Sequence, residues 1–368
     1  MRSLLTTIAE GLPDTVPFTG PEALERRTGI AFRARVGANE SGFGPSPRVI
    51  EAVRAMAPGM WMYGDPEVFE LKAALAARLG VPQANVVVGE GIDGLHGLIA
   101  RLIIAPGDVA VTSLGAYPTF NYHVAGFGGR TVFVPYAGYR EDLGGLAEAA
   151  RRERAKVVYL SNPDNPMGTW WSTSEISAFL DAVPEETLVL LDEAYCETAP
   201  AGTLPPLQPE RPNVIRTRTF SKAYGLAGMR VGYAIGEAGF IRAFDKVRNH
   251  FGVTRASQVA AVAALGDEAW LRGVVERVDA ARRRLYAVAQ ENGLAAVESA
   301  TNFVAIDCGR DGAFAGSVLK ALERRGVFVR KPGAPGLDQH VRISVGPEPE
   351  MKVVATELPE ALREATGG

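Results

Sequence analysis

The stretch Leu188-Val189-Leu190-Leu191 is an uninterrupted apolar run that ends at Asp192-Glu193-Ala194-Tyr195. A strand with this pattern has no polar face, so it lies in a sheet that is covered on both sides. Six other short runs rich in β-branched residues have the same texture: Val86–Gly89, Val109–Thr112, Thr131–Val134, Val157–Leu160, Val214–Thr217 and Val231–Ile235. The sequence therefore predicts a seven-stranded central sheet.

Helical patterns separate several of these runs. They cover Phe69–Leu79, Asp93–Ile104, Ser174–Ala182 and Phe240–Val247. Strands that alternate with helices are typical of an α/β fold whose sheet is mostly parallel. We expect this large domain to span residues 46–250.

The alternation of apolar strands and helices ends after Asn249. A helical stretch rich in Ala and Arg covers residues 257–292, and a strand, a helix and a strand are expected at Phe303–Asp307, Ala315–Arg325 and Val341–Val345. Residues 1–45 contain several prolines and are expected to be irregular, wrapping onto one of the domains. Residues 1–45 and 251–368 are thus predicted to form a smaller α+β domain with an N-terminal arm.

Composition excludes several functions. The 368 residues carry 39 Lys and Arg against 42 Asp and Glu, a net charge of −3, which argues against a nucleic-acid or membrane surface. Cys196 and Cys308 suggest no disulfide framework, and with four scattered histidines they make no metal-ligand spacing. Neither a signal peptide nor a membrane-spanning run is expected, so we predict a cytoplasmic protein that acts on small molecules.

A glycine-rich match follows the strand at Val86–Gly89. Gly89-Glu90-Gly91-Ile92-Asp93-Gly94 fits the G-x-G-x-x-G pattern of dinucleotide-binding proteins. That interpretation requires an acid at the end of the next strand to hold a ribose, and Thr112-Ser113-Leu114-Gly115 has none. Free amides at a helix N-terminus still predict a bound phosphate.

Four polar segments follow candidate strands or lie within one. They are Ser161–Gly168, Asp192–Tyr195, Thr219–Arg230 and Val341–Gly346. Three of them lie at the carboxyl ends of strands, where open α/β sheets collect their ligands. Each segment alone is weak, but all four in this order indicate one shared site.

These segments resemble the fold-type I pyridoxal-5′-phosphate (PLP) aminotransferases, and most of all the histidinol-phosphate aminotransferase family. The resemblance runs from Val36 to Val345 and includes Gly37-Ala38-Asn39-Glu40-Ser41 and Tyr63-Gly64-Asp65-Pro66. Its most specific part is Ser-Lys-x-x-Gly-x-x-Gly-x-Arg, which occupies residues 221–230. The resemblance implies a transaminase of amino-acid biosynthesis that uses PLP and a 2-oxo acid such as 2-oxoglutarate.

The resemblance also implies residue roles around the cofactor ring. Lys222 would form the Schiff base with PLP and then move the substrate proton, for which a lowered pKa is favourable. Asp192 would pair with the pyridine nitrogen and keep the ring an electron sink. Asn165 and Tyr195 would bond the phenolic oxygen, and Tyr117 would stack on the ring.

The cofactor phosphate requires donors and positive charge. A tyrosine of the partner subunit reaches this phosphate in the family, so its match, Tyr63, implies a homodimer with shared active sites. The other phosphate ligands implied by the resemblance are Thr219, Ser221, Arg230 and the amides of Gly91, Ile92 and Asp93.

Substrate contacts are implied for three residues, and two departures affect them. Arg342 would hold the substrate carboxylate, with Asn39 nearby and Arg330 at the distal end. Family members carry a tyrosine where the segment Val16-Pro17-Phe18 offers Phe18, and their Pro-Tyr-Asn segment is replaced by Asn249-His250-Phe251-Gly252. A pocket that loses a hydroxyl loses affinity for the group which that hydroxyl would bond. An aromatic or other amino acid is therefore an alternative donor to histidinol phosphate.

Other functions remain open at this stage. A PLP-dependent decarboxylase of amino-acid phosphates would use the same Lys222 and Asp192, and release of CO₂ would distinguish it from a transaminase. A PLP-sensing regulator would carry a basic DNA-binding domain before this fold, but only about 45 non-basic residues precede it. An α/β protein without PLP would require the four motifs to coincide by chance.

Overall fold

The computed structural model describes residues 4–14 and 18–367. Its central sheet contains β2 (Val86–Gly89), β3 (Val109–Ser113), β4 (Arg130–Val134), β5 (Val157–Ser161), β6 (Leu188–Asp192), β7 (Val214–Thr219) and β8 (Gly232–Ile235). These seven strands lie in the order β2-β8-β7-β6-β5-β3-β4. All neighbours are parallel except β8, which is antiparallel to both β2 and β7. The predicted α/β fold with a mostly parallel seven-stranded sheet is confirmed.

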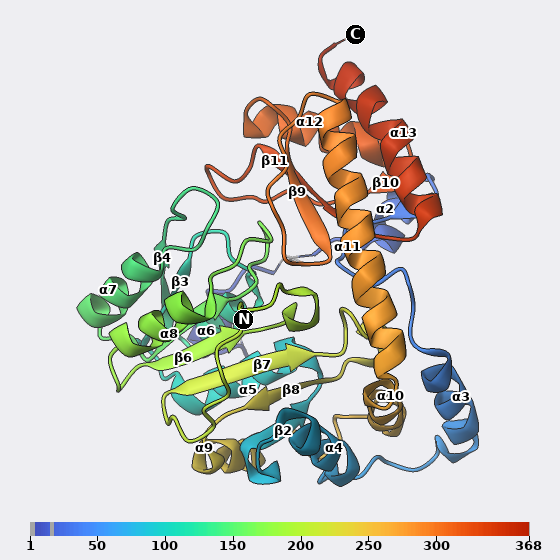
Figure 1. Cartoon of the computed structure of the whole chain (residues 1–368). Coiled ribbons are helices and arrows are strands. Elements are labelled where there is room, and N and C mark those ends of the chain that lie inside the picture. The colour runs from blue at the N-terminus through green and yellow to red at the C-terminus, as the bar shows by residue number, and fades with distance from the viewer. Residues whose placement is uncertain (1–3, 15–17, 368) are drawn as a thin grey trace.

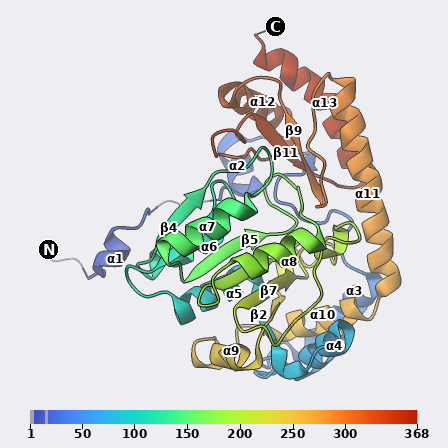
Figure 2. The same ribbon diagram turned by 60° about the vertical axis from the view of Figure 1, so that its left-hand side comes forward.

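Helices cover both faces of this sheet, as the apolar strands require (Figures 1 and 2). On one face lie α5 (Gly91–Ile103), α6 (Thr119–Gly126) and α9 (Ala238–Ala243), which share a buried core with β5 and β6. The other face is covered by α7 (Leu143–Glu153), α8 (Thr173–Ala182), α3 (Pro47–Met56), α4 (Phe69–Leu79) and α10 (Arg255–Leu265). Short 3₁₀ turns occupy Ala57–Gly59, Gln83–Asn85, Cys196–Thr198, Ala227–Met229 and Phe244–Lys246.

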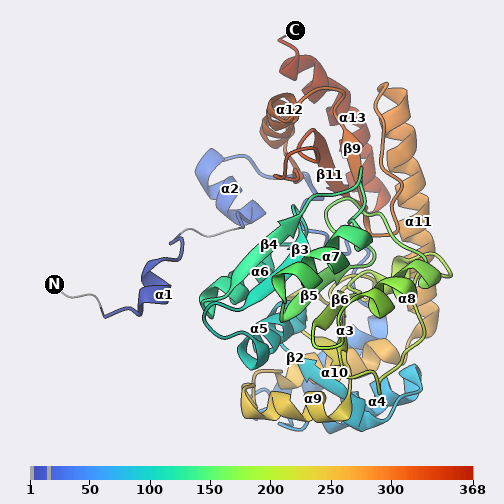
Figure 3. The same ribbon diagram turned by 90° about the vertical axis from the view of Figure 1, so that its left-hand side faces the viewer.

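The smaller domain lies above the sheet in Figure 1. Its core joins the antiparallel pair β9 (Phe303–Asp307) and β11 (His340–Ser344) to α11 (Glu268–Glu291), α12 (Gly312–Arg324) and α13 (Glu348–Ala365). The N-terminal part contributes more regular structure than predicted, with α1 (Thr7–Glu10), α2 (Pro21–Thr28) and β1 (Ala34–Arg35), which pairs with β10 (Val327–Phe328). Arg35 binds Glu22 and Glu25 of α2 at 2.8 and 2.7 Å and so ties this helix to the small domain. Figure 3 shows α1 farther out, toward the N-terminal end.

The predicted helix over residues 257–292 is two helices, α10 and α11. The chain turns at Gly266-Asp267, and the Asp267 side chain accepts a hydrogen bond from the Trp270 amide that begins α11. α10 packs in the same core as α3 and α4, whereas α11 continues upward into the small domain (Figure 1). The domain boundary near residue 250 therefore stays a prediction. Because α10 packs with α3 and α4 of the large domain, the packing favours a boundary within α11.

Candidate active site

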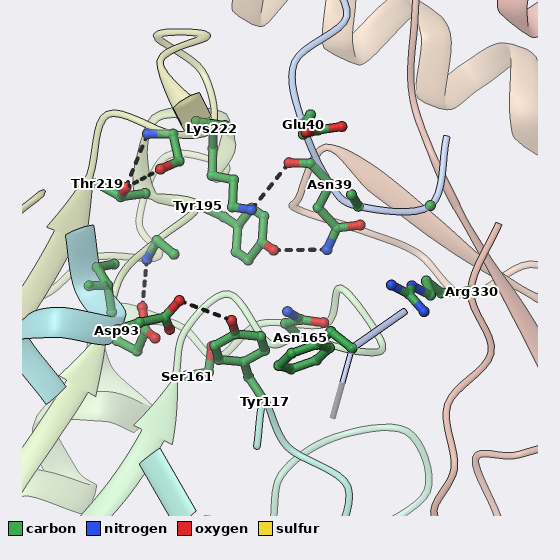
Figure 4. A pocket seen from close by; sticks show the side chains of 18 of the residues that line it. Asn39, Glu40, Asp93, Tyr117, Ser161, Asn165, Tyr195, Thr219, Lys222 and Arg330 are labelled. Atoms are coloured by element: carbon green, nitrogen blue, oxygen red, sulfur yellow. Dashed lines mark hydrogen bonds between the residues drawn. The ribbon is translucent and has the colours of Figure 1, made fainter. Parts of the chain in front are cut away.

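The carboxyl ends of β5, β6 and β7 border a cavity of about 420 Å³, and Arg330 and Arg342 of the small domain contribute to its wall. Figure 4 shows the side chains that line it. Most of the predicted site residues are among them: Phe18, Asn39, Ile92, Asp93, Tyr117, Asn165, Asp192, Tyr195, Thr219, Ser221, Lys222, Arg230, Arg330 and Arg342. Of the predicted residues, Gly91 and Tyr63 are not part of the cavity wall.

Lys222 lies on the turn after β7 and points into this cavity (Figure 4). Its Nζ donates a hydrogen bond to the Asn39 carbonyl at 3.2 Å and lies 5.5 Å from the centre of the Tyr195 ring. Burial, followed by the positive charge of Arg342, lowers the pKa of this amine to about 8. A larger fraction of this amine is therefore neutral near physiological pH than of an ordinary lysine, and a nucleophile or proton acceptor requires the neutral form.

Asp192 ends β6 on the floor of the cavity and is buried. The Ala194 amide donates to its Oδ1 at 3.0 Å, and the Tyr159 hydroxyl donates to its Oδ2 at 2.9 Å. Burial raises the pKa of Asp192 to about 7, while these two donors act in the opposite direction. A cation placed beside this carboxylate would be stabilised, and it would favour the ionised form of Asp192 in turn.

Tyr195 and Asn39 connect the floor of the cavity to the small domain. The Asn39 amide donates to the Tyr195 hydroxyl oxygen at 3.0 Å. The backbone of Asn39 has a φ of 55°, a left-handed conformation that asparagine tolerates better than most residues. Ser344 holds it there, since its hydroxyl donates to the Asn39 Oδ1 and accepts from the Asn39 N–H, both at 3.0 Å.

Arg342 comes from β11 and has neutral partners only. Its guanidinium donates to the Asn165 Oδ1 at 2.5 Å and to the Gly37 carbonyl at 3.3 Å. Its Nε is buried without a partner, and within the described residues it forms no ion pair with a carboxylate. Burial lowers the pKa of Arg342. A guanidinium held in this way is available to a planar anion from outside.

A cluster of donors lies at the opposite end of the cavity. The Ser221 N–H donates to the Thr219 hydroxyl at 3.0 Å, and a guanidinium nitrogen of Arg230 lies 3.5 Å from the Ser221 hydroxyl. The N-terminus of α5 begins here without a side-chain cap, so its first amides face the same space. Gly91 lets Arg230 approach, since a Cβ at this position would lie 2.6 Å from the Arg230 Nη2. Hydroxyls, free amides and a guanidinium together fit a phosphate.

Two aromatic rings lie between these ends. Phe18 and Tyr117 stack with their centroids 6.1 Å apart and their planes inclined by 18°. The Tyr117 hydroxyl donates to Asp93 at 3.4 Å, and its pKa is raised to about 12, first by burial. Phe18 is 43% exposed, and the two residues before it, Val16 and Pro17, lie outside the described residues.

Arg330 marks the far side of the cavity, opposite Thr219 and Asp93 (Figure 4). Its guanidinium donates to the Thr19 carbonyl at 2.6 Å and lies over the Phe328 ring. Its backbone pairs with that of Arg342 in an antiparallel bridge, which places both guanidiniums beside the same cavity.

Several wall and support residues were not among the sequence predictions. Tyr159 lies inside a strand, where its pattern is that of a core residue, and its bond to Asp192 is visible only in three dimensions. Seven further cavity residues were not among those predicted to bind cofactor or substrate: Gly37, Ala38, Glu40, Ser161, Ala194, Ala227 and Gly228. Each of them lies in a sequence segment that was quoted for the site, and that place in the sequence was the available signal.

Tyr63 lies on the surface, with 77% of its area exposed, and contacts the Phe251 ring at a centroid distance of 4.8 Å. Met60 and Trp61 beside it are also exposed. Across residues 4–14 and 18–367, no group of three His, Cys, Asp or Glu side chains is placed to hold a metal ion, and no helix is long and apolar enough to cross a membrane.

Comparison with known proteins gives a consistent result. The profile of the family described as aminotransferase class I and II matches residues 35–358. Histidinol-phosphate aminotransferase 2 of Carboxydothermus hydrogenoformans is 38% identical over 343 residues, covering 92% of this chain and 93% of the relative. The enzyme of Moorella thermoacetica with the corresponding name is 36% identical over 351 residues, covering 94% and 90%.

A solved structure is more similar still. The crystal structure of histidinol-phosphate aminotransferase from Sinorhizobium meliloti, in complex with pyridoxal-5′-phosphate, has 53% sequence identity and a TM-score of 0.96 and covers 98% of both chains. Aspartate aminotransferase from Thermus thermophilus, in complex with maleate, has 24% identity and a TM-score of 0.79, which shows a shared fold.

Proposed function

The chain belongs to the class I and II aminotransferase family, and on that premise we propose that it transfers the amino group of histidinol phosphate to 2-oxoglutarate with PLP as cofactor. One observation carries this proposal most directly. The Lys222 amine, with its pKa lowered to about 8, shares a cavity with the buried Asp192 carboxylate and with an Arg342 that lacks an anionic partner.

The residues present fit PLP. The aldehyde of PLP requires an amine, its pyridine nitrogen requires a carboxylate, and its phosphate requires a cluster of hydrogen-bond donors; the cavity contains all three. The Nε of Arg342, which is buried without a partner, leaves a place for a substrate anion. Lys222 and Asp192 would hold the aldehyde and the pyridine nitrogen, and Thr219, Ser221 and Arg230 the phosphate. When bound, PLP supplies an electron sink for the carbanion left by loss of a substrate proton.

The protein's own groups then perform the remaining tasks. Lys222 Nζ accepts the proton from the carbon that carries the amino group of the donor, and in the second half of the reaction it donates a proton to the carbon of the 2-oxo acid that receives the amino group. Asn39 holds this amine through its carbonyl and the Tyr195 hydroxyl through its amide, so both groups keep one orientation. The buried floor excludes water around Asp192, which strengthens its interaction with a cation there.

Two cations at the substrate end favour a dianionic partner. Arg342 and Arg330 are backbone neighbours, and each binds only carbonyl oxygens or an amide oxygen within the described residues. 2-Oxoglutarate has two carboxylates, which can bind the two guanidiniums. Histidinol phosphate has one phosphate, which can bind one guanidinium or both. Phe18, which stacks on Tyr117 between the two ends, offers a ring without a hydroxyl, and this favours an aromatic amino acid as the second candidate donor.

We propose a homodimer in which Tyr63 serves the phosphate site of the partner subunit. Tyr63 lies outside the cavity of its own chain, and the exposed residues Met60, Trp61 and Phe251 around it support a buried contact in the dimer. The two free thiols, Cys196 and Cys308, support the cytoplasmic location that we propose.

A half-reaction screen tests the function. The purified protein is mixed with PLP, its visible absorbance is followed, and histidinol phosphate, glutamate and phenylalanine are added singly. We expect a visible band that is lost with histidinol phosphate and with glutamate, and no such loss in the Lys222→Ala variant. Loss with glutamate and phenylalanine alone would reassign the donor as an aromatic amino acid. Absence of any band after addition of PLP would contradict the proposal as a whole.

A further inference from the structure

A second pair of acids lies behind the cavity wall. Glu141 and Asp164 are 1% and 2% exposed, and their carboxyl groups are in hydrogen-bonding contact with each other. Each of the four carboxyl oxygens also accepts one bond from elsewhere: Glu141 Oε1 from the Ser161 N–H at 3.2 Å, Glu141 Oε2 from the Ser113 hydroxyl at 2.9 Å, Asp164 Oδ1 from the Tyr136 hydroxyl at 2.8 Å and Asp164 Oδ2 from the Met167 N–H at 2.9 Å.

Two buried carboxylates in contact cannot both be ionised without a cation between them. Among the described residues, Arg342 is the cation whose charge acts on Asp164, and it favours the ionised form of that carboxyl. The phenols of Tyr136 and Tyr159 also lie near the pair, and they are neutral at physiological pH, since burial raises their pKa values further above the ordinary 10.0. Burial likewise raises the pKa values of Glu141 and Asp164. The stable protonation state of such a pair is therefore one protonated carboxyl group and one ionised carboxylate.

Asp164 also organises the turn that carries Asn165. Its N–H donates to the Thr169 carbonyl at 2.8 Å, its carbonyl accepts from the Gly168 N–H at 3.1 Å, and its side chain holds the Met167 amide. Asn165, the next residue, accepts the 2.5 Å bond from Arg342. Movement of the acid pair would therefore displace Asn165, which is one of the two hydrogen-bond partners of Arg342.

We propose that Glu141 and Asp164 share one proton and act as a positioning pair, which holds the 162–168 turn and places one negative charge behind Arg342. The inference rests on the proposed function only for the roles of Asn165 and Arg342. Loss of the shared proton at alkaline pH would leave two carboxylates in contact, and their repulsion would loosen the turn. The affinity for substrate would then fall, while Lys222 and Asp192 would stay in place.

Glu141→Gln and Asp164→Asn provide matched tests. Each replaces one carboxyl by an amide of the same size, so the pair keeps a single negative charge and has no proton to lose. We expect the wild-type KM for the amino donor to rise at alkaline pH with a smaller change in kcat, and we expect this rise to be absent in both variants. The double variant removes the charge and is expected to change KM at neutral pH. An unchanged alkaline rise in KM in both single variants would overturn the proposal, because a purely structural pair would not move the pH profile.

Two further measurements do not depend on activity. In the infrared difference spectrum of wild-type holoenzyme minus Glu141→Gln at neutral pH, we expect the carbonyl band of one protonated carboxyl. In unfolding experiments the folded pair keeps a proton that an unfolded glutamate releases above its ordinary pKa of 4.5, so wild-type stability falls relative to Glu141→Gln as pH rises above that value. The folding equilibrium constant of the wild type, divided by that of Glu141→Gln, is expected to fall about tenfold per pH unit until the folded pair loses its proton. Equal pH dependence and equal infrared spectra would overturn proton sharing even if the enzyme proved to have a different substrate.

Discussion

Arg230 and Arg342 lie at opposite ends of one cavity and have different surroundings. The Arg230 side chain is 51% exposed and has an ion pair with Asp93 at 3.8 Å. Arg342 is partly buried in the wall, binds the neutral oxygens of Asn165 and Gly37 and, among the described residues, contacts no carboxylate. The first cation forms an ion pair before any ligand arrives, whereas the second forms none among the described residues.

The difference matches two kinds of ligand. Around Arg230, free amides of α5 and the hydroxyls of Thr219 and Ser221 provide many donors, as a permanently held phosphate requires. Around Arg342, burial disfavours the charged guanidinium, so an incoming anion stabilises it strongly. Neutral partners can be exchanged for a carboxylate without breaking an ion pair. We infer that the Arg230 end retains the cofactor while the Arg342 end exchanges substrates.

The largest effect is expected where the two ends meet, at Lys222. Lys222→Ala removes the only amine placed between them, because no other lysine lines the cavity among the described residues. Multiple-turnover transamination should be abolished, while equilibrium dialysis should still detect PLP and substrate binding at the two ends. Lys331→Ala, on the small domain outside the cavity, serves as the control. Measurable turnover by Lys222→Ala would show that another group moves the proton.

Asp192→Asn should have the next largest effect, because it removes the negative charge from the floor without changing the size of the side chain. Loss of a preorganised electrostatic partner typically costs on the order of 10²–10³-fold in kcat. Asp93→Asn is the matched control at the phosphate end, since its exposed 3.8 Å ion pair with Arg230 contributes little. Single-turnover kinetics should separate the two variants. Equal rates for Asp192→Asn and wild type would remove Asp192 from the mechanism.

Exchanging the two arginines one at a time tests the comparison itself. Arg342→Gln should raise the KM for the amino donor by roughly 10–100-fold, since a charge-assisted hydrogen bond contributes about 1.5–3 kcal/mol. Arg230→Gln should instead weaken PLP binding and leave KM nearly unchanged once PLP is saturating. Steady-state kinetics at saturating PLP and a PLP titration measure the two quantities. If both variants changed KM, or if both changed PLP affinity, the two ends of the cavity would not bind substrate and cofactor separately.

A smaller effect connects Arg342 to Lys222. The charge of Arg342 is the second cause, after burial, of the lowered pKa of Lys222, about 8. Capture of PLP by the apoprotein requires the neutral amine, so its rate should rise with pH and level off above about pH 8. In Arg342→Gln the pKa should be higher, and the midpoint of this profile should move to higher pH. A shift to lower pH, or no shift, would contradict the coupling.

The two ends also differ in how far the sequence reveals them. Asp192 ends β6, Asn165 and Lys222 lie a few residues after β5 and β7, and the carboxyl ends of neighbouring parallel strands must meet at one edge of the sheet. Their proximity was therefore predictable from pattern alone. The contacts of Arg342 with Gly37 and of Asn39 with Ser344 join residues that are 305 positions apart. No local pattern encodes such pairs, and only the resemblance to a family indicated those residues.

The same reason explains the elements that were missed. The helices α3, α6, α7 and α13 were not predicted. Of these, α6 mixes polar and aromatic residues without a clear period, and α7 contains Gly144 and Gly145 near its start. Both helices are stabilised by burial, as Phe120 of α6 and Leu146 of α7 show. The pairing of β1 with β10 likewise depends on the assembled small domain.

The smallest effect is expected at Phe18, which stacks near Tyr117 between the two ends. Phe18→Tyr adds one hydroxyl to a ring that is 43% exposed, so folding should be unaffected. A new neutral hydrogen bond contributes about 0.5–1.5 kcal/mol, which corresponds to a few-fold lower KM for a donor whose phosphate it can reach. Glutamate is shorter and has no phosphate, so its KM should stay the same. The ratio of the two KM values for histidinol phosphate and glutamate is therefore the quantity to measure. An equal change in the KM values of both donors would place Phe18 at the cofactor rather than at the distal end of the substrate. Phe18 and Tyr117 would then belong to the end that retains the cofactor, and the end that exchanges substrates would not include them.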